Sequence, residues 1–366
     1  MNECPYTLLP ATPIVTPLGV GASYTPTYTP MGVLRVVPSS EMMEVAPSQA
    51  AGPRQYAPPL TESCVASENL SKQPTMVAAA HATVVTRALP YGGPVQLLSL
   101  AIEQHNALTS RRTEKQILLF QPVSLKEFIV LLDHIKHYHR ILKLDYNCLS
   151  ELLVVKVMPG WDHEYTIALF RKAINKQLAA MYLDDEYLTL ASPLMALHDG
   201  SKEPDTCWIP TSSPRRPTCV VEVGTSESQA RLATDARRWL ESSNFGIQTV
   251  ITVCFKYLQA ETDESPLTVS IWSLLHQQYN MTTRNPYLRV KQTATLNIYR
   301  KNGSLSVSGS QLDPLTLVET ETDKIYIPLK SLIGRPPVNP GERDVILTKE
   351  AVLKIFEQLL QSRLEL

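Results

Sequence analysis

Two carboxylates stand in neighbouring β-rich segments near the middle of this 366-residue chain. Asp205 follows Pro204 at the head of segment 206–209, and Glu222 lies inside segment 218–223. A carboxylate in an apolar strand is costly to bury alone, so Glu222 needs a partner or a cation. Two carboxylates that meet at a sheet edge can hold Mg²⁺, which takes a few carboxylate oxygens and keeps several waters. Such an ion would lower the pKa of its bound water and stabilise charge on a phosphate.

The same residues allow a plainer interpretation. In that interpretation Asp205 starts a turn after Pro204, and Glu222 faces solvent on an edge strand. Short acidic patterns of this kind arise often by chance. Only the metal site requires that the two carboxylates lie close enough to share one ion.

The elements that must position these carboxylates follow from the hydrophobic period. Apolar residues recur at helical spacing from Leu125, with Ser124 as the N-cap, and again over residues 165–182. Segment 247–255 is a continuous apolar run, which is typical of a buried central strand. A helix between the second carboxylate strand and this run would return it through a right-handed crossover.

That connecting helix and the C-terminal elements have their own signals. Ser226 followed by Gln229 fits a capping box at the start of the helix. A last amphipathic helix is predicted from Thr348 to about Arg363. Further strands are predicted over residues 267–273, 293–300, 305–308 and 324–327.

Three stretches together resemble a known superfamily. They are Pro204-Asp-Thr-Cys-Trp-Ile-Pro210, Glu222-Val-Gly-Thr-Ser-Glu227 and Leu232-Ala-Thr-Asp-Ala-Arg-Arg-Trp-Leu240. In this order they resemble the PD-(D/E)XK restriction-endonuclease-like superfamily, and more narrowly an uncharacterised fungal group of that fold. The similarity runs from about Met158 to the C-terminal helix and leaves out the N-terminal arm.

The resemblance implies a fold, a site and a reaction. The fold is α/β, with a restriction-endonuclease-like central mixed β-sheet flanked by helices. Asp205 and Glu222 would be metal ligands, the carbonyl of Val223 a further ligand, and Glu164 the assisting acidic residue. The cofactor would be Mg²⁺ or Mn²⁺, and the reaction the hydrolysis of DNA or RNA phosphodiesters. We expect His163, next to Glu164, to cap its helix.

The chain departs from the superfamily at the lysine that orients the attacking water. Its position is Gly224 here, and the alternative position on the following helix is Asp235. Arg231, Arg237 and Arg238 are the available substitutes, and Arg238 is the candidate for a catalytic role. Arginine can hold a phosphate but cannot serve as a general base. Alternatively, Arg231, Asp235 and Arg238 form a surface ion-pair ladder, because they lie one turn apart.

Three functions therefore stay open from the sequence. The first is a metal-dependent endonuclease, and the second is a catalytically silent pseudo-nuclease used as a binding or accessory module, for example in a fungal gene cluster. The third is an enzyme that uses the same carboxylates on another substrate. The chain has no Gly-rich phosphate loop, Gly-x-Ser-x-Gly elbow or His-Glu-x-x-His helix, which argues against NTPases, esterases and zincins.

Composition and charge indicate the domain organisation of the chain and exclude some partners. Half of the 28 prolines precede residue 95, which predicts a disordered arm over residues 1–95 and one folded domain over 96–366. Within it we expect a helical lead-in over 96–157 and the core over 158–366. The net charge of −1 excludes a global attraction to nucleic acid. No apolar run suits a membrane helix, so we expect an intracellular protein, nuclear or cytoplasmic, of undetermined oligomeric state.

Overall fold

The computed structural model describes residues 88–364, with gaps at 111, 114, 136–140, 159, 226, 244–245, 257–265, 277–287, 302–303 and 314–315. The predicted disordered arm therefore lies almost wholly outside the described residues. All described residues fall within one compact unit, residues 56–366. None of the described helices is long and apolar enough to cross a membrane.

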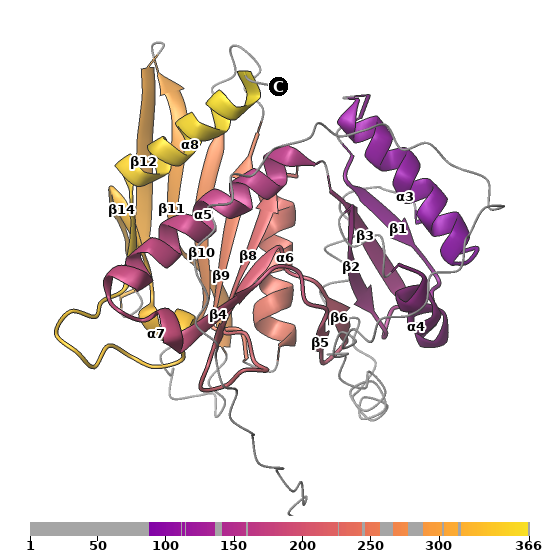
Figure 1. The fold of residues 1–366 in the computed structure, drawn as a ribbon, viewed down its shortest axis with the longest axis horizontal. Helices are drawn as coiled ribbons and strands as arrows, with labels where there is room; N and C mark the ends of the chain where they lie inside the picture. Colours follow the sequence, from indigo (N-terminus) through magenta and orange to yellow (C-terminus); the bar gives the residue numbers. More distant parts are fainter. Residues whose placement is uncertain are drawn as a thin grey trace, which may run out of the picture. The chain divides into compact units, whose positions relative to one another are not determined.

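The described chain contains both helices and strands, with long runs of consecutive strands between the helices (Figure 1). In order they are α3 (Pro94–Thr109), β1 (Ile117–Phe120), α4 (Leu125–His134), β2 (Leu142–Asn147), β3 (Leu152–Val157), α5 (Trp161–Ala180), the 3₁₀ turn η2 (Asp184–Glu186), β4 (Tyr187–Leu190), β5 (Met195–Leu197), β6 (Gly200–Lys202), β7 (Thr206–Pro210), β8 (Cys219–Gly224), α6 (Gln229–Ser242), β9 (Thr249–Phe255), β10 (Leu267–His276), β11 (Leu288–Lys301), β12 (Ser304–Leu312), β13 (Glu319–Glu321), β14 (Lys324–Ile327), α7 (Leu329–Ile333), β15 (Val345–Thr348) and α8 (Lys349–Leu364).

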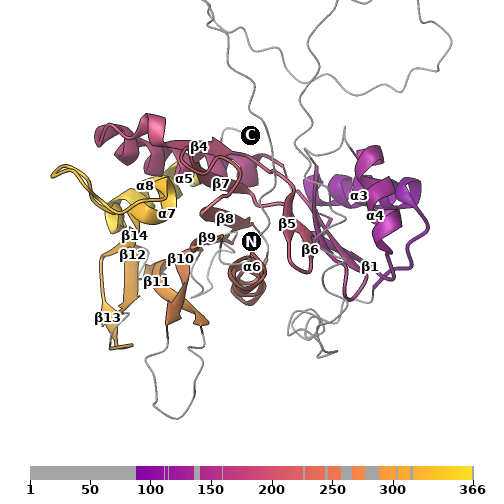
Figure 2. The same cartoon turned by 90° about the horizontal axis from the view of Figure 1, so that it is seen from below.

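The larger sheet carries both predicted carboxylates. Its strand order is β13-β12-β11-β10-β9-β8-β7-β4, and β8 runs parallel to β9 through the α6 crossover, whereas its other pairs are antiparallel. Figure 2 shows α6 on one face of this sheet and α5 with α8 on the other. The prediction of an α/β fold with a mixed sheet flanked by helices is therefore confirmed.

Because side chains alternate along a strand, the two faces of the larger sheet contribute to two separate hydrophobic cores. On β9, Ile251 and Val253 join the core under α5 and α8, whereas Val250 packs with Trp239 and Leu240 of α6. Every residue of β9 is buried, as a central strand requires. Trp208 and Trp239 pack in the core, since both side chains are fully buried.

The segment expected to be a helical lead-in is a second α/β layer. Strands β1, β3, β2, β6 and β5 form a five-stranded antiparallel sheet, and α3 and α4 pack on one of its faces. On β2, Leu144 and Tyr146 join this core, so Lys143 and Asp145 must face the other way. Lys156 of β3 pairs with Lys143 across the two strands, so both lysines lie on the face without α3 and α4.

Helix starts depend on single polar residues, and one prediction among them is wrong. Ser124 is the expected N-cap and also forms a capping box with Glu127, and Thr348 Oγ1 accepts from the Ala351 N–H at 3.3 Å. The N-cap of α6 is Ser228, whose hydroxyl accepts from the Arg231 N–H. Ser226, the predicted cap, lies outside the described residues and two positions too early.

Candidate functional site

Asp205 and Glu222 meet in the interior, where the start of β7 lies beside β8 in the larger sheet. Asp205 precedes β7, and its N–H donates to the Val221 carbonyl at 3.1 Å. The Val223 N–H donates back to Asp205 Oδ2 at 2.5 Å. Both carboxylates are 2% exposed. The interpretation of a simple turn and a solvent-facing Glu222 is therefore wrong.

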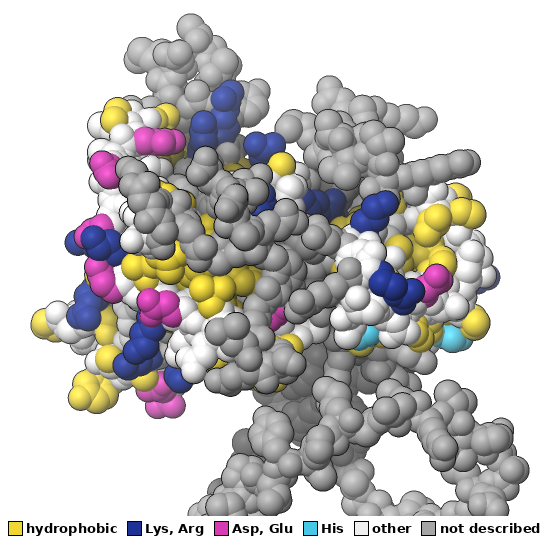
Figure 3. Space-filling view, turned by 90° about the horizontal axis from the view of Figure 1, so that it is seen from above, with side chains coloured by type: hydrophobic (Ala, Val, Ile, Leu, Met, Phe, Trp, Pro, Cys, Tyr) yellow, Lys and Arg dark blue, Asp and Glu magenta, His cyan; other side chains and the backbone are white. Residues whose placement is uncertain are grey.

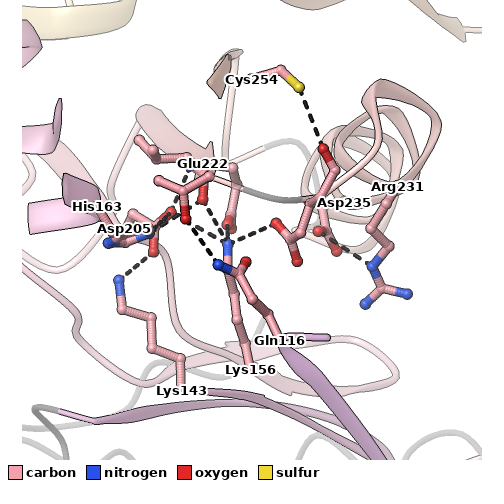
Figure 4. A network of polar contacts seen from close by, with 12 residues as sticks. Gln116, Lys143, Lys156, His163, Asp205, Glu222, Arg231, Asp235 and Cys254 are labelled. Atoms are coloured by element: carbon pink, nitrogen blue, oxygen red, sulfur yellow. Dashed lines mark hydrogen bonds and ion pairs between the residues drawn. The ribbon is translucent and has the colours of Figure 1, made fainter. Parts of the chain in front are cut away.

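A buried ammonium stands among the groups that the resemblance assigns to a metal. Lys156 Nζ lies 2.8 Å from the Val223 carbonyl, 3.6 Å from Asp205 Oδ2 and 4.0 Å from Glu222 Oε2. It also lies 3.0 Å from Glu227 Oε2. Figure 4 shows Lys156 rising from the smaller sheet into this cluster. The structure thus brings the three predicted ligands together around one cation, and that cation is a lysine.

Neighbouring carboxylates stabilise the protonated, charged form of Lys156. Burial alone would lower the pKa of Lys156, but Asp205, Glu227 and Glu222 raise it well above its usual value. Burial would likewise raise the pKa of Asp205, yet Lys143 and Lys156 hold it well below the usual range. Both groups are therefore ionised at neutral pH and form a buried ion pair.

His163 and Lys143 complete the surroundings of Asp205. Lys143 Nζ donates to Asp205 Oδ1. His163 Nε2 lies 3.2 Å from Asp205 Oδ2 and 3.2 Å from the Val223 carbonyl, and the imidazole is fully buried. The expectation that His163 caps its helix is wrong, because the N-cap of α5 is Gly160. Glu164 contacts His163 Nδ1 at 3.4 Å through a mostly exposed carboxylate, so this imidazole lies between Glu164 and Asp205.

Glu222 is held from the side of α6. The Trp239 indole N–H donates to Glu222 Oε1 at 2.5 Å, and Lys202 Nζ lies 3.8 Å from the same oxygen. Burial raises the pKa of Glu222 to about 7, with Lys202 opposing and Asp205 reinforcing the rise. The requirement that a buried Glu222 have a partner is confirmed, and its partners are an indole and two lysines.

Arg238 belongs to a second buried network. Its Nε lies 2.8 Å from Asp145 Oδ1, its Nη1 2.8 Å from Asp199 Oδ2, and its Nη2 donates to the Tyr146 carbonyl at 3.0 Å. These contacts join α6 to β2 and to the turn before β6. The guanidinium is thus committed to internal partners, and the catalytic role predicted for Arg238 stays a prediction without a contact to Asp205 or Glu222.

The alternative of a surface ion-pair ladder is also wrong. Arg231 and Asp235 do pair, at 3.6 Å. However, Asp235 is 3% and Arg238 1% exposed. Lys202 Nζ reaches Asp235 Oδ1 at 3.1 Å, so this helix face contacts the smaller sheet and not solvent.

At Gly224, the position of the missing lysine, neighbouring side chains leave no room for a side chain. A Cβ at Gly224 would lie 2.9 Å from Glu227 Cβ and 3.2 Å from Leu232 Cδ1. Lys143, Lys156 and Lys202 supply positive charge instead, and the first two come from strands that precede the stretch covered by the resemblance. Sequence reasoning missed all three, although Lys143 and Lys156 carry the signal that singled out Glu222: a charge inside an apolar strand.

A hydrated divalent ion does not fit this arrangement. The cavity beside Lys156, lined among others by Glu222, Glu227 and Asp235, has a volume of about 20 Å³. That volume admits roughly one water molecule, whereas Mg²⁺ usually keeps several waters. In addition, among the described residues no three His, Cys, Asp or Glu side chains are arranged as a metal-binding group.

The Trp239 hydrogen bond leads to a stability prediction. Trp239→Phe leaves the buried Glu222 carboxylate without its indole donor, so we expect a loss of about 2–3 kcal/mol in unfolding free energy. Trp208→Phe is the matched control, because the Trp208 indole donates to the neutral Asn175 Oδ1 at 2.9 Å. Its expected loss is smaller, about 1 kcal/mol for the hydrogen bond. Urea unfolding measures both, and equal losses would contradict a special role for the Glu222 bond.

Comparison with known proteins adds one solved structure. No protein-family model and no curated protein matches the chain. The crystal structure of a "putative nuclease belonging to DUF820" from Anabaena variabilis matches with a TM-score of 0.34 and 13% identity, over 64% of this chain and 99% of that one. A similarity this low leaves the function to be argued from the residues of this chain.

Proposed function

We propose that this chain is a catalytically silent, nuclease-like module of the restriction-endonuclease type. The observation that carries the proposal is the position of Lys156 Nζ, which bonds the Val223 carbonyl and pairs with the Asp205 and Glu222 carboxylates. These are the three groups that the resemblance assigns to a catalytic ion. An ammonium there provides one positive charge but no Lewis acidity and no activated water.

The surrounding charges support a permanent role for the lysine. Lys143 and His163 already satisfy Asp205, and Trp239 and Lys202 already satisfy Glu222. A divalent metal ion would therefore have to displace the Lys156 ammonium and could not bind beside it. The proposed function therefore depends on Lys156 staying in place.

The metal-dependent nuclease is the competing proposal, and one observation favours it. Asp205, Glu222 and the Val223 carbonyl point at a common cation position, as a nuclease of this type requires. For Mg²⁺ to bind there, Lys156 and the strand that carries it would have to withdraw. Metal binding and cleavage by the wild-type protein distinguish the two proposals.

DNA or RNA as a partner stays a proposal. On the face drawn in Figure 3, acidic and basic side chains are interspersed on the left of the view. Arg215 and Arg216 are exposed, but they follow β7, at the end of that strand remote from Asp205. Nucleic-acid binding would therefore not depend on the carboxylate pair.

The test is a metal titration combined with a cleavage assay. For wild type and for Asp205→Asn, we expect no calorimetric Mg²⁺ or Mn²⁺ binding at the site and no metal-dependent cleavage of single- or double-stranded DNA or RNA. Metal-dependent cleavage by the wild type that Asp205→Asn abolishes would overturn the proposal and establish the nuclease. Binding of nucleic acid equally by both proteins, without cleavage, would support the module.

A further inference from the structure

The two edges of the eight-stranded sheet differ in their protection against pairing. One edge is β13, Glu319–Glu321, which carries two exposed glutamates. The other edge is β4, Tyr187–Leu190, which has no charge and exposes Leu188 at 49% and Leu190 at 40%. Charges on an edge strand prevent association with other strands, and an uncharged apolar edge permits it. Figure 2 shows the two strands at opposite ends of the sheet.

The hydrogen-bond pattern between β4 and β7 shows which backbone groups of β4 point away from β7. The Thr211 N–H donates to the Glu186 carbonyl at 3.0 Å, and these two residues extend the β4–β7 register by one position beyond the pair of Tyr187 and Pro210. Bonded and non-bonded pairs alternate along an antiparallel ladder, so Leu188 and Leu190 bond to β7. The N–H and C=O of Thr189 therefore point to the free side of the sheet.

We propose that β4 pairs with β4 of a second copy of this chain, antiparallel and centred on Thr189. The two Thr189 residues would exchange both N–H···O bonds. Leu188 would lie opposite the second copy's Leu190, and Leu190 opposite its Leu188, in the closely spaced non-bonded pairs. The interface is self-complementary about a two-fold axis, as in most homodimers.

Charge and side-chain pattern favour a second copy over an unrelated strand. In this register the acidic turn η2, Asp184–Glu186, lies opposite residues 192–194, which are Ser, Pro and Leu. The acidic turns of the two copies therefore do not face each other. Moreover, Leu188 and Leu190 share the sheet face of the buried Ile209 and Cys207, so pairing extends an existing apolar surface.

Sedimentation over a concentration series tests the interface. We expect wild type to reach the mass of a dimer, and Leu190→Lys to stay a monomer with an unchanged circular dichroism spectrum. Val318→Lys, at a position 57% exposed next to the opposite edge, is the control and should dimerise like wild type. A monomeric wild type, or a Leu190→Lys variant that dimerises as well, would overturn the proposal.

Cross-linking tests the register independently of affinity. Directly bonded residues in antiparallel strands lie about 5.5 Å apart at Cα, within the range that a disulfide spans. Thr189→Cys should form a covalent dimer when a mild oxidant takes up the two thiol protons and electrons. Ala191→Cys should not, because its two copies lie four residues apart in register. Equal cross-linking of both variants would contradict this register, even where the protein is dimeric.

Discussion

Lys156→Ala is expected to lose about 3–5 kcal/mol of unfolding free energy, which is the usual effect of removing one partner of a buried ion pair. The substitution leaves Asp205, Glu222 and Glu227 without the ammonium that all three contact. It also removes the donor to the Val223 carbonyl. Chemical unfolding at pH 7 measures the loss directly.

The same variant is expected to gain a response to metal. Removing the lysine side chain opens space beside the existing cavity and leaves oxygen donors around the former ammonium position. Oxygen ligands suit Mg²⁺ and Mn²⁺. A ligand that binds only the folded state stabilises it by roughly 2.7 kcal/mol at 100 times its dissociation constant. We therefore expect millimolar Mn²⁺ or Mg²⁺ to raise the melting temperature of Lys156→Ala and to leave wild type unchanged.

Lys202→Ala is the matched control for the metal response. Lys202 is equally buried and pairs with Glu222, Asp235 and Asp145. It does not bond the Val223 carbonyl, so its loss leaves Lys156 in the cation position. We expect a similar destabilisation without restoration by metal. Restoration of both variants would indicate unspecific binding to exposed carboxylates, and no restoration of Lys156→Ala would show that the three oxygens do not form a latent ion site.

The elements around the carboxylates could be predicted because each has a strong local signal. The apolar run of β9 and the caps Ser124 and Thr348 are read from neighbouring residues. The parallel pairing of β8 with β9 follows from the β–α–β order and the handedness of crossovers. A meeting of Asp205 and Glu222 was expected from their positions in neighbouring β-rich segments and from the resemblance, which implies that both are metal ligands.

The lysines could not be predicted, because their contacts cross between two sheets. Lys143 and Asp205 are 62 residues apart, and Lys156 and the Val223 carbonyl are 67 residues apart. Segment 96–157 looked helical because the helical period of α4 is strong, whereas β2 and β3 are short and contain charges. A charge in a short strand is usually read as a sign of exposure. Here alternation buries one face of β2 against α3 and α4 and the other against the carboxylates.

Glu222→Gln is expected to remove a pH dependence of stability that wild type shows between about pH 4.5 and 7. The pKa of Glu222 is about 7 in the folded protein against a usual 4.5, chiefly because the carboxyl is buried. In this window the folded state binds more protons than the unfolded state, so wild-type stability falls as pH rises. The slope is about 1.4 kcal/mol per pH unit, which makes the full effect roughly 3 kcal/mol.

Glutamine keeps an oxygen for the Trp239 indole and cannot ionise, so Glu222→Gln should match or exceed wild type at pH 8 and lose its advantage at pH 5. Asp205→Asn is the control with the opposite sign. The pKa of Asp205 is lowered by Lys143 and Lys156 against the effect of burial, so its contribution is present above about pH 4 and is lost only in more acidic solution. Asp205→Asn should therefore be less stable than wild type throughout pH 5–8, and it should keep a fall in stability with pH over a narrower window, because the Asp205 charge contributes to the raised pKa of Glu222. A Glu222→Gln variant with the wild-type slope would show that Glu222 is already ionised at pH 5, held so by Lys156 and Lys202.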